Sequence, residues 1–183
     1  MKGKDNMSHK TLFLQQSYED CTRQYMELLE KQKMPLWDYV ILTASNESQA
    51  QSYRMQIQYR LDHGMLPKSI HYAVLPDPDG KRVGSGGATL NVLRYIHQDA
   101  GSFDDKRILV IHSGGDSKRV PQYSALGKLF SPVPHKLPNG RNSTLFDEFM
   151  ISMSSVPSRM REGMLLLSGD VLLLFNPLQI DYN

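Results

Sequence analysis

Cysteine, net charge and long apolar runs are all scarce in this chain of 183 residues. Cys21 is the only cysteine, so an internal disulfide and a cysteine-based zinc site are both excluded. The formal net charge of +2 is too small to indicate binding to nucleic acid or to an anionic membrane. No apolar run approaches the roughly 20 residues of a membrane span, and the start lacks the apolar core of a signal peptide. We therefore expect a protein of a reducing compartment, the cytoplasm, with no nucleic-acid or membrane partner.

The composition is that of a soluble globular protein, with 40% hydrophobic and 22% charged residues. The chain is long enough for one domain with a hydrophobic core. Apolar residues recur at helical spacing over residues 11–34, which predicts an amphipathic helix that packs on that core and ends before Pro35.

A strand, a helix and a second strand are predicted next, over residues 37–44, 49–63 and 70–75. This order is typical of a βαβ unit, whose two strands pair in parallel. We expect Met55 and Tyr59 on the buried face of the helix.

A glycine-rich segment, G-S-G-G-A-T, then leads into an apolar helical pattern. The free amides and the positive dipole end at a helix start stabilise an anion, so the segment is a candidate phosphate site. The alternatives are a tight turn without a ligand and an NAD site. Against NAD, the segment follows a proline-rich turn instead of a strand, and no acidic residue clearly ends the next strand. Its candidate nucleotide-binding residues are Gly84, Gly86, Gly87 and Thr89.

The most informative stretch is R-I-L-V-I-H-S-G-G-D-S-K-R-V-P-Q-Y-S-A-L-G-K, at residues 107–128. Its continuous apolar run predicts a parallel strand buried on both faces, after which the chain becomes polar and glycine-rich. Glycines let a ligand approach the main chain, and the nearby cations Arg119 and Lys128 suit a triphosphate. An ordinary turn beside a solvated charged face is the alternative. The candidate nucleotide-binding residues are Ser113, Gly114, Gly115, Ser117 and Lys118.

Beyond this stretch we expect an extended loop over residues 129–142, a helix over 145–154 capped by Thr144, and a last buried strand over 164–167. S-G-D follows the last strand and places Asp170 at the carboxyl edge of a parallel sheet, where ligands bind in such folds. A plain turn aspartate is the alternative.

The order of strand, glycine pair, arginine, proline and later lysine resembles the signature of sugar-nucleotide pyrophosphorylases. The chain is more closely similar to the GDP-fucose pyrophosphorylase family, which includes bifunctional fucokinase/GDP-fucose pyrophosphorylases. H-S-G-G-x-S-x-R-x-P and S-A-L-G-K carry this resemblance, including Ser117, where the wider superfamily has glycine. W-D-Y-V-I-L-T-A-S, G-S-G-G-A-T-L and S-G-D-V extend it from residue 37 to about residue 175.

The resemblance implies an α/β fold: a Rossmann-like nucleotidyltransferase sheet, mostly parallel, with helices on both faces. We expect two parts: the residue pattern gives a polar tail with an amphipathic helix at residues 1–36, and the resemblance implies a nucleotide-binding part at residues 37–183. The second part is expected to be incomplete at its C-terminal end.

By the same resemblance, the activity is a nucleotidyl transfer from GTP to L-fucose 1-phosphate that yields GDP-L-fucose and pyrophosphate. Arg119 would bridge the phosphates, Lys128 would act near the α-phosphate, and Asp170 matches an aspartate that holds Mg²⁺. Which of the two glycine segments holds the triphosphate stays open. The alternative from another class is a nucleotide-binding fragment or module, without turnover, of a longer pyrophosphorylase or fucokinase polypeptide.

Overall fold

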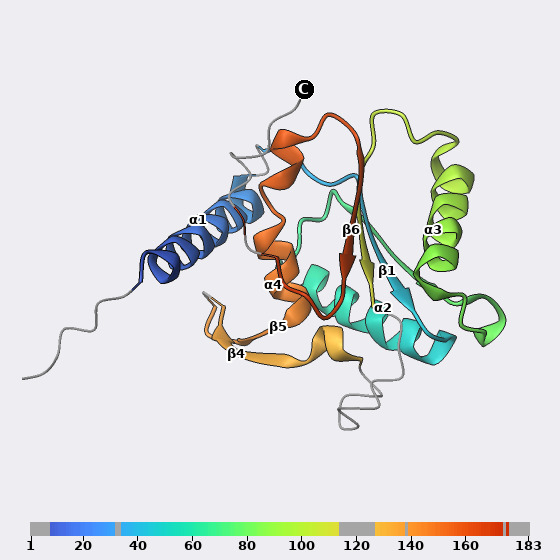
Figure 1. Cartoon of the computed structure of the whole chain (residues 1–183), viewed down its shortest axis with the longest axis horizontal. Helices are drawn as coiled ribbons and strands as arrows, with labels where there is room; N and C mark the ends of the chain where they lie inside the picture. Colours follow the sequence, from blue (N-terminus) through green and yellow to red (C-terminus); the bar gives the residue numbers. More distant parts are fainter. Residues whose placement is uncertain (1–7, 32–33, 114–126, 138, 174, 176–183) are drawn as a thin grey trace, which may run out of the picture.

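The computed structural model describes residues 8–31, 34–113, 127–137, 139–173 and 175 (Figure 1). The helices are α1 His9–Lys31, α2 Glu47–Asp62, α3 Gly84–Ala100 and α4 Leu145–Ser152, with short 3₁₀ turns η1 Pro78–Gly80, η3 Lys128–Phe130 and η4 Val156–Arg159. The strands are β1 Tyr39–Ala44, β2 His71–Pro76, β3 Arg107–His112, β4 Pro132–Lys136, β5 Asn142–Thr144 and β6 Gly163–Ser168.

Four parallel strands form the central sheet, in the spatial order β2-β1-β3-β6. β1 is buried along its whole length, as expected for an apolar strand that is covered on both faces. β2 pairs with one side of β1 and β3 with the other, so the strand order reverses between β1 and β3. In an open α/β sheet, ligands bind beside the carboxyl ends of the strands at such a point.

Helices cover both faces of the sheet (Figure 1). On one face, Val92 and Ile96 of α3 pack against Ile41, Ile108 and Val110 of β1 and β3. On the other face, α1, α2 and α4 contribute side chains to a larger core cluster. The predicted α/β class, with a mostly parallel sheet and helices on both faces, is therefore confirmed, and the predicted helices and strands are present with small shifts at their ends. The prediction that the last strand is buried is wrong: β6 lies at the edge of the sheet, where Leu167 is buried but Leu166 is 47% exposed.

The prediction of an extended loop over residues 129–142 is wrong. β4 and β5 pair there as a short antiparallel hairpin, with an irregular register between Pro132 and Lys136. The prolines in this segment indicated a loop, but an edge strand tolerates proline because it has no ladder hydrogen bond to lose on its open side.

The buried face of α2 also differs from the prediction. Met55 is 65% exposed and Tyr59 is 42% exposed, whereas Tyr53, Ile57 and Arg60 are buried. Arg60 can be buried because Asp147 pairs with its guanidinium, and this orientation of the helix leaves Met55 outside.

The glycine-rich segment forms the first turn of α3 itself and is not a loop before it. Gly84 has a φ of 70°, in the left-handed region that favours glycine. A Cβ added at Gly87 would lie 2.6 Å from the Cβ of Val83, so a side chain there would clash. The helix start thus depends on its glycines for steric reasons, before any ligand is considered. None of the helices in the described ranges combines the length and the apolar character needed to cross a membrane.

Candidate functional site

The carboxyl ends of the central strands bring polar side chains together at one edge of the sheet. Thr43 of β1 is in register with His112 of β3, and His112 is in register with Ser168 of β6. Residues that pair in this way point to the same face of the sheet. Thr43, His112 and Ser168 therefore form a row at the reversal of strand order, on the face of the sheet that α3 covers.

His112 lies between two threonines. The hydroxyl of Thr89 donates to the carbonyl of Ser85 at 2.9 Å, so its oxygen can accept from Nε2 of His112, 3.0 Å away. The oxygen of Thr43 accepts from the N–H of Ser113 at 3.3 Å and lies 3.4 Å from Nδ1 of His112, to which it can donate. This arrangement suits a neutral imidazole protonated at Nε2. In agreement, burial lowers the pKa of His112 below its ordinary value of 6.5.

Ser113, the first residue after β3, makes its side-chain contact on the opposite face of the sheet. Its Oγ lies 2.7 Å from the hydroxyl of Tyr53, which comes from α2. A Cβ added at Gly127 would lie 2.0 Å from the same hydroxyl, and Gly127 has a φ of 70°. The Tyr53 hydroxyl therefore contacts the chain at Ser113 and again at Gly127, on both sides of residues 114–126.

Lys128 directly follows this second contact. Leu129 and Phe130, the other residues of η3, are buried, while the side chain of Lys128 is half-buried. Within the described ranges, the Lys128 ammonium forms no hydrogen bond or ion pair.

The turn after β6 packs directly on the end of β3. The N–H of Gly169 donates to the carbonyl of His112 at 2.8 Å, and a Cβ added at Gly169 would lie 3.0 Å from that oxygen. Asp170 is exposed, and its Oδ1 accepts from the hydroxyl of Ser168 at 2.6 Å. The predicted position of Asp170 at the carboxyl edge therefore agrees with the structure.

A pocket of about 270 Å³ opens beside this edge. It carries both signs of charge, from Asp77 and Arg82. Desolvation raises the pKa of the Asp77 carboxyl, while the N–H of Val83 and the charge of Arg82 act in the opposite direction. The residues that line this pocket are Thr43, Asp77, Arg82, Gly84, Ser85, Ala88 and His112.

The predicted site residues fall into three groups. Thr89, Ser113 and Asp170 meet around the end of β3, Gly84 lines the adjoining pocket, and Lys128 connects to Ser113 through Tyr53. Gly86 and Gly87 stand in the first turn of α3 but do not line the pocket. The other predicted residues, Gly114, Gly115, Ser117, Lys118 and Arg119, lie outside the described residues.

Three residues of this edge were not predicted: Thr43, Tyr53 and His112. Thr43 and His112 could have been found from their place at the ends of the two strands that flank the reversal. Tyr53 gives no signal in the sequence, because its partners Ser113 and Gly127 are far along the chain.

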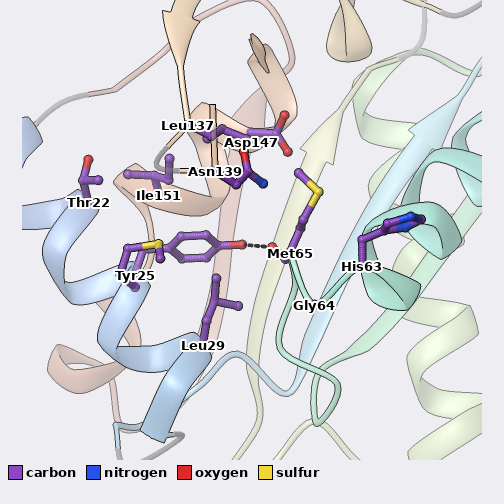
Figure 2. Close-up of a pocket in the computed structure, with 11 residues that line it drawn as sticks. Thr22, Tyr25, Leu29, His63, Gly64, Met65, Leu137, Asn139, Asp147 and Ile151 are labelled. Carbon is purple, nitrogen blue, oxygen red and sulfur yellow. Dashed lines mark hydrogen bonds between the residues drawn. The ribbon is translucent and has the colours of Figure 1, made fainter. Parts of the chain in front are cut away.

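A second pocket, of about 190 Å³, lies between α1, α4 and the end of α2 (Figure 2). Its polar groups are already paired: Tyr25 donates to the carbonyl of Met65 at 2.6 Å, and Asp147 binds Arg60. Its lining is mainly apolar and includes Leu29, Leu137 and Ile151. This pocket offers no free charge to a phosphate.

Comparisons with known proteins point to one family. A family model described as the fucose pyrophosphorylase domain matches residues 100–183. A bifunctional fucokinase/GDP-fucose pyrophosphorylase of Arabidopsis thaliana is 34% identical over 170 residues, which cover 79% of this chain and 16% of that protein. A fucose-1-phosphate guanylyltransferase of Mus musculus is 37% identical over 142 residues, covering 76% of this chain and 23% of that protein.

The corresponding enzyme of Homo sapiens is 37% identical over 124 residues, covering 66% of this chain and 20% of that protein. No solved structure matches the chain significantly. The chain spans between 16% and 23% of the length of these three relatives. By the family model and these relatives together, residues 100–183 match the fucose pyrophosphorylase domain, and the chain is similar to part of the GDP-fucose pyrophosphorylase family.

Proposed function

We propose that this chain carries the nucleotide site of a nucleotidyltransferase that makes GDP-L-fucose and pyrophosphate from GTP and L-fucose 1-phosphate. One observation carries the proposal: three segments of the family resemblance meet at one edge of the sheet. These are the start of α3, the end of β3 and the turn that holds Asp170. Relatives that match the chain are named for this activity.

In the proposed reaction, an oxygen of the sugar phosphate bonds to the α-phosphorus of GTP. The bond from that phosphorus to the bridging oxygen of the β-phosphate breaks, and pyrophosphate leaves with the electron pair. No acid–base pair is required, because the attacking and leaving atoms are both phosphate oxygens. Catalysis then consists mainly of positioning and of stabilising charge on the non-bridging and leaving oxygens.

The cations of this chain suit that task. Lys128, whose ammonium has no partner among the described residues, would act as a point charge near the α-phosphate. Arg119 would bridge phosphates through its planar guanidinium. The contact of Tyr53 with both Ser113 and Gly127 brings the chain before Lys128 close to the end of β3. This favours the segment after β3, over the start of α3, as the triphosphate site.

Magnesium is the proposed cofactor, and Asp170 would hold it. The described residues contain no group of three or more His, Cys, Asp or Glu side chains that could hold a metal ion. A single exposed carboxylate nevertheless fits magnesium, which keeps several waters and takes other ligands from phosphate oxygens. When bound, the ion would neutralise charge on the phosphates.

Nucleotide binding without turnover is the second candidate function. It is favoured by the coverage of the relatives, since this chain spans only 16% to 23% of their length. It shares the same nucleotide site, so GTP would bind but GDP-L-fucose would not form.

A thermal-shift titration tests the proposal, with GTP, ATP and NAD each measured with and without magnesium. A ligand at 100 times its dissociation constant should stabilise the chain by about 2.7 kcal/mol. We expect selective stabilisation by GTP that magnesium increases and that Lys128→Ala removes. Lys136→Ala is the matched control, because Lys136 is an exposed lysine of the β4–β5 hairpin.

Three outcomes separate the possibilities. Equal shifts with NAD, or equal losses in the two lysine variants, would contradict the proposed site. A GTP shift followed by GDP-L-fucose formation when L-fucose 1-phosphate is added supports the enzyme. A GTP shift with no product supports the binding module.

A further inference from the structure

Tyr53 is a fully buried side chain with a hydroxyl group at the candidate site. It has no exposed surface and lies in the middle of α2. Its hydroxyl is 2.7 Å from Oγ of Ser113, the residue that follows β3. A buried hydroxyl needs a hydrogen-bond partner, so this contact fixes the position of Ser113 relative to α2.

The same hydroxyl also restricts the chain at Gly127. A Cβ added there would lie 2.0 Å from the hydroxyl oxygen and 2.7 Å from the nearest ring carbons. Gly127 also has φ 70° and ψ 154°, a backbone conformation open essentially to glycine alone. The main chain can therefore pass close against Tyr53 only because residue 127 has no side chain.

The ring of Tyr53 holds the next residues in place. It packs against Phe130 with ring centroids 5.1 Å apart, and Phe130 packs in turn against Phe146 at 5.1 Å. Leu129 has no exposed surface. Because Leu129 and Phe130 are both buried, the backbone of Lys128 is held between Gly127 on one side and these two anchored side chains on the other.

We propose that Tyr53 is a positioning residue of the nucleotide site, which sets Ser113 and the backbone of Lys128 in their places relative to each other. This inference rests on the proposed function, because Lys128 is taken to act on the phosphates of GTP. Tyr53 itself touches no substrate. Its hydroxyl acts through the two residues that it holds.

The test is to measure the dissociation constants of GTP and guanosine by titration calorimetry, on the full chain and on Tyr53→Phe. Phenylalanine keeps the ring and its packing on Phe130 and removes only the hydroxyl. We expect GTP to bind roughly three- to tenfold more weakly, the range that one neutral hydrogen bond is worth. Guanosine should bind as before, because it has no phosphate for Lys128 to contact.

Two further variants make the test specific. Tyr59→Phe is the matched control, the same change on an exposed part of the same helix, and should leave both constants unchanged. Tyr53→Phe added to Lys128→Ala should weaken GTP binding by less than the product of the two single effects, because one residue acts through the other. Ser113→Ala removes the other half of the hydrogen bond and should weaken GTP binding at least as much as Tyr53→Phe. It keeps the test decisive if Tyr53→Phe does not fold.

Wild-type GTP affinity in Tyr53→Phe would overturn the inference and leave the proposed function standing. Equal weakening of GTP and guanosine would also overturn it, since a general loss of structure affects both ligands. Full multiplication of the two effects in the double variant would show that Tyr53 does not act through Lys128. If the unaltered chain binds no GTP, the proposed function fails first, and the inference fails with it.

Discussion

Two polar residues two turns apart on the buried face of α2 bind different parts of the molecule. Tyr53 reaches the edge of the sheet, where it meets Ser113 through a single hydrogen bond. Arg60 reaches α4, where Nε and Nη2 bind the two oxygens of Asp147 at 2.7 and 3.0 Å. The guanidinium of Arg60 also lies 5.0 Å from the ring centroid of Phe130.

The region around α4 and the edge of the sheet differ in whether their charged side chains are paired. Around α4, each buried carboxylate has strong partners: Asp147 binds Arg60, and Glu148 accepts from Tyr18 at 2.5 Å. At the edge of the sheet, Lys128 and Asp170 have no ionic partner among the described residues. The pair of Arg60 and Asp147 is buried and supports the packing of α4, whereas Lys128 and Asp170 are the charges that the proposed function assigns to the ligand. Changes in the first region should therefore affect stability, and changes in the second should affect binding.

The largest effect is expected from Asp147→Ala. It leaves the buried guanidinium of Arg60 without its partner and removes the capping box that Asp147 forms with Thr144 at the start of α4. Breaking a buried pair on one side costs about 3–5 kcal/mol of unfolding free energy. Urea denaturation measures this loss of unfolding free energy.

Asp62→Ala is the matched control, an exposed aspartate at the end of α2, and should change stability by less than about 0.5 kcal/mol. Replacing both partners, as Arg60→Met with Asp147→Leu, should recover much of the loss, because no buried charge remains. A loss below about 1 kcal/mol for Asp147→Ala would contradict a structural role for the pair.

The sequence predicts the framework of this fold better than its site. Continuous apolar strands and the cap at Thr144 are local signals, so β1, β3, β6 and α4 were predicted close to their true bounds. The buried face of α2 was missed because Arg60 reads as a surface residue until Asp147, 87 positions later, is brought beside it.

The contacts of the site's polar network do not show in the sequence for the same reason, although the strand ends that carry Thr43 and His112 can be predicted. His112 is held by Thr43 and Thr89, which lie 69 and 23 positions away. Only the parallel register of β1 with β3 places Thr43 next to His112. Asp170 could be predicted because its position depends only on the end of its own strand.

Asp170→Asn should have an intermediate effect, on ligand binding alone. The side chain is exposed and asparagine keeps the oxygen that accepts from Ser168, so stability should change by less than about 0.5 kcal/mol. The increase in GTP affinity that magnesium produces should fall by about tenfold or more, since even outer-shell ligands of metals are worth that much. Calorimetric titration with and without magnesium measures the two GTP affinities, and urea denaturation measures the stability. Asp104→Asn, an exposed aspartate away from this edge, is the control, and an unchanged magnesium effect in Asp170→Asn would remove Asp170 from the metal site.

The smallest effect concerns His112, where the neutral network at the edge depends on pH. Burial lowers the pKa of His112 in the folded chain below 6.5, so the unfolded chain binds the proton more readily. This contribution to stability is therefore complete above about pH 6.5 and is lost as the pH falls below it. His112→Gln should cost roughly 1 kcal/mol at pH 7, the net worth of a hydrogen bond, and should make stability fall less steeply as the pH is lowered.

Thermal unfolding between pH 7.5 and pH 5 compares the slopes of stability against pH for wild type and His112→Gln. His97→Gln, which changes an exposed histidine of α3, is the control. Equal slopes in wild type and His112→Gln would mean that the imidazole stays as easily protonated in the folded chain as in the unfolded one, against its neutral placement between the two threonines.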